Sequence, residues 1–150
     1  MEYMFLPFRR YFDFKGRSRR MEYWMFTLLN VIIAVVLMLI VFGGSGLAEI
    51  GAGGESDAEV FAGLFGGLGI LFLLWFLAVL IPSIAVTVRR LHDRNMSGWW
   101  YLGFIVGGAI PYVGVIVSIA MLVIMFLPGT EGPNRFGPDP KNPTSADVFE

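Results

Sequence analysis

Three long runs of apolar residues, separated by polar segments, organise this chain. They extend over about residues 23–42, 61–88 and 99–127, and none of them contains Asp, Glu, Lys or Arg. Each run reaches the roughly 20 residues that an α-helix needs to cross a bilayer. The pattern predicts an all-α protein, a polytopic bundle of transmembrane helices.

The third run is too long for one upright span and too short for two full spans. Its middle reads Gly107-Gly-Ala-Ile-Pro-Tyr-Val-Gly114, and a cluster of Gly and Pro favours a break. Either the run forms one long, kinked and tilted helix, or it forms a tight helical hairpin that returns the chain to its starting side. The bundle therefore has three or four spans, and this choice decides on which side the C-terminus lies.

The segments outside the apolar runs predict an additional helix, a loop and a tail. With Pro7 as the first residue of a helix, Phe8, Tyr11 and Phe12 share one face, which predicts an N-terminal interfacial amphipathic helix rather than a disordered basic tail. Residues 43–60 are acidic and Gly-rich and predict an outer loop, whereas residues 128–150 predict a Pro-rich, non-helical tail. We expect residues 1–142 to form a single membrane domain.

Composition and charge support this interpretation and orient the chain. The sequence is 56% hydrophobic and 15% charged, whereas soluble domains average about 45–50% apolar and 25% charged residues. Nine of the eleven Lys and Arg residues lie in the first twenty positions or in residues 89–94. The charged residues of segment 43–60 are all acidic. The positive-inside rule then predicts a cytoplasmic N-terminus. The long aromatic and basic segment before the first run argues against a cleaved signal peptide.

Several classes of chemistry lack the residues that they need. The chain has no Cys, which excludes disulfides and thiolate chemistry, and His92 is its only His, so we expect no metal site and no cofactor. The three apolar runs contain no charged residue, whereas ion-coupled carriers usually have ionisable residues within their spans, so the pattern argues against such a carrier acting alone. Phosphate-binding and dinucleotide-binding motifs are absent, and basic residues beside spans indicate anionic lipid rather than nucleic acid. We therefore do not expect an enzyme.

The densest polar cluster is Arg89-Arg-Leu-His-Asp-Arg94, directly after the second run. If this segment is helical, Asp93 lies within reach of both Arg89 and Arg90. The cluster has two interpretations, namely anchoring with a structural salt bridge or a site for an anionic headgroup or partner.

A second polar cluster precedes the first run. Arg19 and Glu22 are three residues apart, and Arg20 and Trp24 are four apart. On a helix these spacings suit an ion pair and a cation–π contact, respectively.

Three polar signatures, one beside each apolar run, resemble the domain of unknown function 805 family of small bacterial inner-membrane proteins. The signatures are Phe14-Lys-Gly-Arg-Ser-Arg-Arg20 with Glu22-Tyr-Trp24, Arg89-Arg-Leu-His-Asp93 with Ser97-Gly-Trp-Trp100, and Pro128-Gly-Thr with Asn134-Arg-Phe-Gly-Pro-Asp-Pro140. The resemblance covers about residues 11–140. It implies a compact multi-helix protein of the bacterial inner membrane and implies no reaction. The longer segment 43–69 departs from the family pattern.

We expect a non-enzymatic membrane module whose arginine-rich cytoplasmic face binds anionic lipid or a partner, either a second copy or another membrane protein. The alternative is an oligomeric small-solute channel or transporter component, with breaks at Pro82 and Pro111 lining a path. If the tail returns to the cytoplasm, its polar residues can join the two clusters. The candidate binding residues are Arg17, Arg19, Arg20, Glu22, Trp24, Arg89, Arg90, His92, Asp93, Trp99, Trp100, Asn134 and Arg135.

Overall fold

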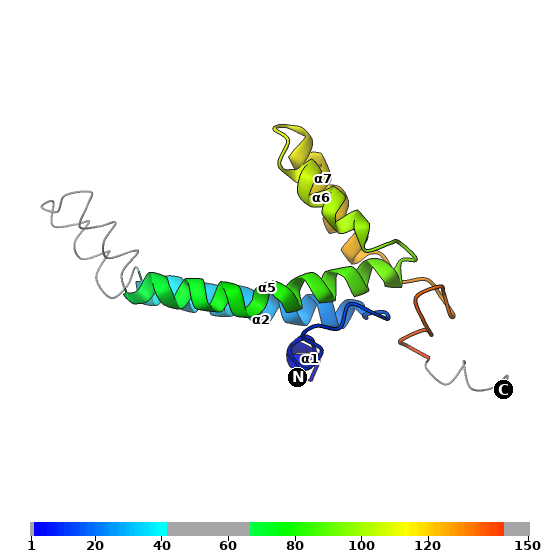
Figure 1. Cartoon of the computed structure of the whole chain (residues 1–150), viewed down its shortest axis with the longest axis horizontal. Helices are drawn as coiled ribbons and strands as arrows, with labels where there is room; N and C mark the ends of the chain where they lie inside the picture. The colour runs from blue at the N-terminus through cyan, green and yellow to red at the C-terminus, as the bar shows by residue number, and fades with distance from the viewer. Residues whose placement is uncertain (1, 42–66, 143–150) are drawn as a thin grey trace, which may run out of the picture. The chain divides into compact units, whose positions relative to one another are not determined.

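The computed structural model describes residues 2–41 and 67–142, and within these ranges it contains five α-helices and no β-strand. The helices are α1 (Glu2–Arg9), α2 (Arg20–Val41), α5 (Gly67–Asp93), α6 (Trp99–Gly108) and α7 (Val113–Phe126), as Figure 1 shows. The all-helical class agrees with the sequence pattern. The predicted acidic loop of residues 43–60 lies outside the described residues.

Within residues 2–41 and 67–142, two helices are long and apolar enough to cross a membrane. The candidate spans are Arg20–Ile40, of 21 residues, and Gly69–Asp93, of 25 residues. The first agrees with the first apolar run. The second continues through Pro82 and beyond the predicted end at Val88, so that Arg89 and Asp93 belong to the last turns of α5. The predicted start of this run, residues 61–66, lies outside the described residues.

The third apolar run is broken into two helices, as the hairpin alternative requires. α6 ends at Gly108, α7 begins at Val113, and the two helices contact each other (Figure 1). Pro111 has no backbone N–H to continue the hydrogen bonds of a helix. Tyr112, at the turn, has a positive φ of 66°. A Cβ added to Gly114 would lie 2.3 Å from the carbonyl oxygen of Gly108. Glycine therefore allows the close approach that closes the hairpin.

The N-terminal helix exists, but its bounds differ from the prediction. α1 begins at Glu2 and carries Pro7 in its last turn, not at its first position. Because the helix ends at Arg9, Tyr11 and Phe12 lie beyond it, and the predicted common helical face with Phe8 is wrong. Proline removes only one hydrogen bond from this short helix, so residues before it remain helical. The Phe8 ring instead packs edge-to-face on Phe26, 5.3 Å between ring centroids.

The chain divides into two compact units, Met1–Phe26 with Pro82–Glu150 and Thr27–Ile81. In the described residues the interior is unusually polar, because seven polar or charged side chains are buried beside seven apolar ones, Pro7 and Pro82 included. Large apolar side chains along α2, α5, α6 and α7 are exposed. This distribution is the opposite of a soluble core and is typical of helices whose apolar faces meet lipid. The buried polar residues all belong to the first unit; they are Arg17, Ser18, Glu22, Thr87, Arg89, Arg90 and Asp93.

Candidate functional site

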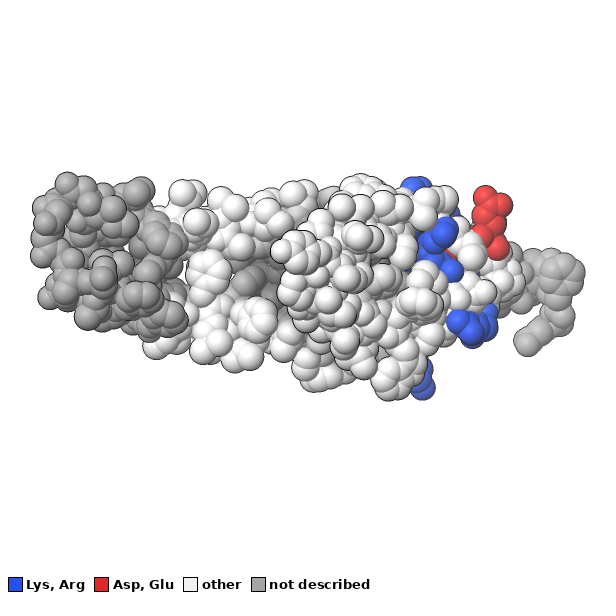
Figure 2. Space-filling view, turned by 90° about the horizontal axis from the view of Figure 1, so that it is seen from above, with Lys and Arg blue, Asp and Glu red and all other residues white. Residues whose placement is uncertain are grey.

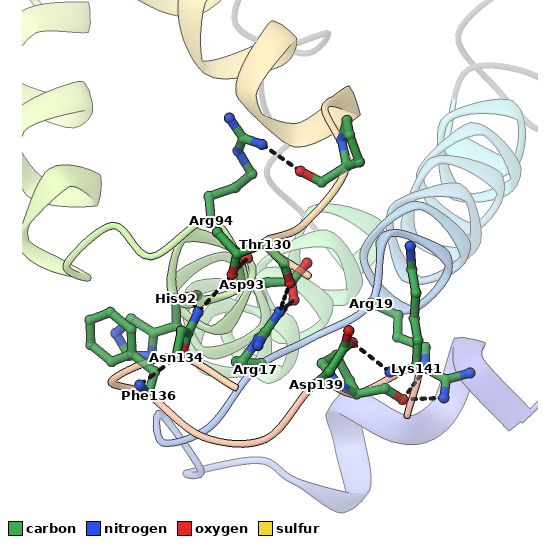
Figure 3. A network of polar contacts seen from close by, with 12 residues as sticks. Arg17, Arg19, His92, Asp93, Arg94, Thr130, Asn134, Phe136, Asp139 and Lys141 are labelled. Carbon is green, nitrogen blue, oxygen red and sulfur yellow. Dashed lines mark hydrogen bonds and ion pairs between the residues drawn. The ribbon is translucent and has the colours of Figure 1, made fainter. Parts of the chain in front are cut away.

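The candidate site is a polar cluster where the start of α2, the end of α5 and the C-terminal tail meet within the first unit. Asp93, in the last turn of α5, lies at its centre. Nε of Arg17 donates to Oδ1 of Asp93 at 3.0 Å, and Nη1 of Arg90 donates to Oδ2. One carboxylate thus compensates two guanidinium groups that are at most 1% exposed (Figure 3 shows Arg17 beside Asp93). The pairing of Arg90 with Asp93 was expected from their spacing.

Arg89 does not pair with Asp93, although their spacing permits it. Its Nη2 lies 2.9 Å from Oε1 of Glu22 in the first turn of α2, and both side chains are buried. The Nη1 of Arg89 donates to the carbonyl oxygens of Arg10 and Asp13, at the end of the N-terminal segment. Arg89 therefore joins the end of α5 to the N-terminal segment and the start of α2, which lie more than sixty residues away in sequence.

The predicted Arg19–Glu22 ion pair is also absent, because Arg89 occupies Glu22. Nε and Nη2 of Arg19 donate instead to the carbonyl oxygen of Pro140, with 2.6 Å between Nε and that oxygen. Nη1 of Arg19 reaches the hydroxyl of Tyr3 at 3.3 Å. The N-terminal side of α2 is thereby tied to the tail rather than to its own helix.

Three arginines satisfy carbonyl groups at the end of α7. Arg90 donates to the carbonyls of Met125 and Leu127, Arg20 to Phe126 at 3.2 Å, and Arg94 to Pro128. The last four carbonyls of a helix have no intrahelical partner, and a helix C-terminus carries partial negative charge. Cations at this position therefore cap α7 both geometrically and electrostatically. They also place the end of the hairpin beside the end of α5.

The tail in turn caps α5. The backbone N–H and hydroxyl of Thr130 both donate to the Asp93 carbonyl, at 2.8 and 3.1 Å, and the Asn134 amide donates to the His92 carbonyl at 2.9 Å. Nη2 of Arg135 donates to the Asn95 carbonyl at 3.0 Å. Asn134 and Arg135 thus join the cluster, as the hairpin alternative predicts. Figure 3 shows Thr130 and Asn134 converging on the end of α5.

His92 is held from two sides. Its Nδ1 lies 3.1 Å from the carbonyl oxygen of Gly16, and its ring stacks on Phe136 with 3.9 Å between centroids. Because a carbonyl oxygen only accepts, Nδ1 carries the proton in this hydrogen bond. His92 therefore links the segment before α2 to the tail, and no described His, Cys, Asp or Glu group of three gathers around it to hold a metal ion.

Asp139 closes the tail into a loop. Its carboxylate accepts the backbone N–H groups of Lys141 at 2.9 Å and Gly132 at 3.2 Å. The hydrogen bond from Lys141 is the largest cause that lowers the pKa of Asp139 below its ordinary value of 3.8. The carboxylate is thus charged in the folded tail at neutral pH, and its acceptor sites are occupied by the backbone.

The three tryptophans among the candidate binding residues differ in their contacts and exposure. Trp24 stacks on Phe126 with 4.2 Å between ring centroids, which replaces the cation–π contact predicted between Trp24 and Arg20. Trp99 and Trp100, at the start of α6, are 79% and 55% exposed and do not join the polar cluster. They belong to the exposed apolar surface of the helices, and tryptophan is common at membrane–water interfaces.

A polar cavity of about 490 Å³ opens beside the cluster. Its wall combines the start of α2 with Asp93 and two stretches of the tail. The lining residues are Arg19, Arg20, Asp93, Gly129, Thr130, Glu131, Gly132, Asp139, Pro140, Lys141 and Asn142. The volume falls within the range of sites for small molecules or headgroups. The arrangement can therefore bind a charged group.

Charged side chains are also concentrated on the molecular surface. On the face drawn in Figure 2, the Lys, Arg, Asp and Glu side chains of the described residues lie close together, and the white surface beside them carries no charge. Among the cations, Arg20, Arg135 and Lys141 are exposed, whereas Arg17, Arg89 and Arg90 are buried. The three buried arginines cannot meet a ligand without rearrangement of the fold.

Sequence reasoning missed several residues of the cluster, although part of the signal was present. Gly129 lies so close to Asp93 that an added Cβ would be 2.0 Å from Oδ2, and Thr130 and Asp139 organise the tail. All three belong to the tail signature that contributed to the family resemblance. Arg94 carried no signal beyond its charge, because its partner is a backbone carbonyl.

Comparison with known proteins identifies close relatives. The family model described as "Protein of unknown function (DUF805)" matches residues 11–138. Inner membrane protein YhaH of Escherichia coli (strain K12) is 39% identical over 94% of this chain and 98% of its own length. Inner membrane protein YhaI of the same strain is 36% identical over 94% of this chain and 97% of its own length. No solved structure matches the chain.

Proposed function

The chain belongs to the DUF805 family of proteins of unknown function, and from this premise we propose that its arginine-rich end binds anionic lipid headgroups at the cytoplasmic face of the inner membrane. The relatives YhaH and YhaI are inner membrane proteins, which supports the same location for this chain. The proposed activity is non-enzymatic.

The membrane topology that suits this activity has the N-terminus in the cytoplasm. Two helices cross the bilayer, and the α6–α7 hairpin enters from the cytoplasmic side and returns to it. α6 has 10 residues and α7 has 14, or roughly 15 and 21 Å at 1.5 Å per residue. The hydrocarbon core is about 30 Å thick, so neither arm spans it. The tail then lies in the cytoplasm beside the start of α2.

The observation that carries the proposal is that some arginine side chains are buried and others are exposed. Arg17, Arg89 and Arg90 are buried and hold the segments together, whereas Arg20 and Arg135 are exposed. Arg20 is the first residue of an apolar helix of span length, which supports a position at the level of lipid phosphates. The buried arginines thus position the cluster, and the exposed ones contact lipid.

Native mass spectrometry with equimolar phosphatidylglycerol and phosphatidylcholine of identical acyl chains tests this activity. We expect preferential retention of phosphatidylglycerol by the unchanged protein. Combining Arg20→Gln with Arg135→Gln should reduce the preference by about fivefold for each cation removed, since a basic residue near an anionic surface contributes about 1 kcal/mol.

The matched control combines Arg20→Lys with Arg135→Lys, which keeps both charges and should keep the preference. Indifference of the unchanged protein to headgroup charge would exclude the assignment to anionic lipid. A loss of preference in both double variants would show that charge is not the cause.

A further inference from the structure

Among the described residues, three charged side chains of the polar cavity make no ion pair and at most one hydrogen bond. Asp93 forms ion pairs with Arg17 and Arg90, Asp139 accepts hydrogen bonds from two backbone N–H groups, and Arg19 donates to the Pro140 carbonyl, so these three side chains are already engaged in several contacts. The remaining ionisable side chains of the cavity wall are those of Arg20, Lys141 and Glu131.

These three side chains make no ion pair within the described residues. Arg20 donates one hydrogen bond, to the Phe126 carbonyl, and keeps its other N–H groups for a ligand. Lys141 and Glu131 are exposed. The cavity therefore offers two cations and one carboxylate to the same occupant.

The position of the cavity indicates which class of ligand it binds. Arg20 begins the apolar helix α2, and four residues later Trp24 stacks on Phe126, the last residue of the apolar helix α7. Stacked aromatic rings at the ends of apolar helices indicate the level of the membrane interface. The cavity thus opens where phospholipid headgroups lie, not where a soluble partner would first meet the protein.

A phosphate diester satisfies the two cations, and a primary ammonium group satisfies the carboxylate with hydrogen bonds as well as charge. A quaternary ammonium group has no N–H to donate, so it matches Glu131 less well. A headgroup that ends in hydroxyl groups leaves Glu131 uncompensated.

We propose that this cavity is a specific site for the phosphoethanolamine headgroup of a phospholipid, in which Arg20 and Lys141 bind the phosphate and Glu131 binds the ammonium group. The inference goes beyond the proposed function, because phosphatidylethanolamine carries no net charge, and it rests on that function only in requiring the polar cluster to face lipid headgroups. It adds a selectivity that general attraction to anionic lipid does not provide.

The test compares phosphatidylethanolamine with phosphatidylcholine, which carry the same net charge, by native mass spectrometry of the full chain. We expect the unchanged protein to retain phosphatidylethanolamine preferentially, and Glu131→Gln to reduce that preference by about tenfold, as loss of a hydrogen bond to a charged group predicts. Glu2→Gln, an exposed acidic change outside the cavity, should leave it unchanged.

Lys141→Gln should weaken binding of both lipids equally, because both carry the phosphate. Equal retention of the two lipids by the unchanged protein, or an unchanged preference in Glu131→Gln, would overturn the site while leaving the phosphatidylglycerol result intact. Complete displacement of the lipid by soluble glycerophosphoethanolamine at matched concentration would overturn the lipid assignment, since the ligand would then be a soluble molecule.

Discussion

Asp93 lies between two buried guanidinium groups, those of Arg17 and Arg90, and its backbone carbonyl accepts two hydrogen bonds from Thr130. Buried ion pairs are costly to desolvate, so their presence alone does not show stabilisation. Removing one member is different, because the remaining charge stays buried without compensation. Here a single carboxylate compensates two such charges.

We therefore expect Asp93→Asn to destabilise the protein by about 3–5 kcal/mol, measured as a lower unfolding temperature in mild detergent. Asp13→Asn is the matched control, because Asp13 also pairs with an arginine three residues away but its side chain is 39% exposed. Partly exposed pairs contribute about 0–1 kcal/mol. Similar losses in both variants would refute the assigned role of Asp93.

The α6–α7 hairpin depends on glycine at its closed end. Gly114 is buried against the Gly108 carbonyl, and Gly107 faces Val117, whose Cγ2 would lie 3.2 Å from an added Cβ. A backbone carbonyl cannot move away as a flexible side chain can. The hairpin therefore tolerates no added side chain at Gly114 without separating its arms.

Gly114→Ala should destabilise the protein by about 1–3 kcal/mol, the usual cost of overpacking. Gly103→Ala is the control, since Gly103 lies in α6 with no atom within 4 Å of its added Cβ. Thermal unfolding of the two variants in the same detergent separates packing from helix propensity. A harmless Gly114→Ala would contradict the close approach.

For the whole molecule, the proposed topology places the N-terminal segment and the tail on the same side of the membrane. The buried cluster supports this arrangement, because Arg17 donates hydrogen bonds to the carbonyl oxygens of Thr130 and Gly132 in the tail. A third complete span would carry the tail to the opposite side, and these contacts could not form across about 30 Å of hydrocarbon.

Single-cysteine labelling can test this topology directly, because the chain contains no Cys. With a membrane-impermeant maleimide, we expect Lys15→Cys and Pro138→Cys to react only in inverted vesicles. Ser56→Cys, in the segment that charge assigns to the outer side, should react only in intact cells. Tyr112→Cys, at the hairpin turn, should react from neither side before denaturation.

Two results would exclude the re-entrant hairpin. Labelling of Tyr112→Cys from outside would mean that the hairpin crosses the bilayer completely. Labelling of Pro138→Cys from outside would mean that the chain crosses a third time and that the tail contacts are not formed in the membrane.

The sequence by itself determined the helical class, the apolar runs that become α2 and α5, and the non-helical tail. It located the irregular segment near Pro111 but left a kinked helix and a hairpin as alternatives. These features follow from hydrophobicity, proline and glycine over short distances along the chain. The proximity of Asn134 and Arg135 to the other polar residues was predictable only as a consequence of the hairpin alternative.

The tertiary structure alone decided which charges pair. Arg19 and Arg89 both have a carboxylate at helical spacing, yet Glu22 pairs with Arg89, and Arg19 binds the Pro140 carbonyl. Local spacing cannot rank these partners, because the choice depends on burial and on carbonyl groups from segments more than sixty residues away. The sequence likewise does not show which charged side chains of the cavity make few contacts, because that depends on the partners of the neighbouring charges.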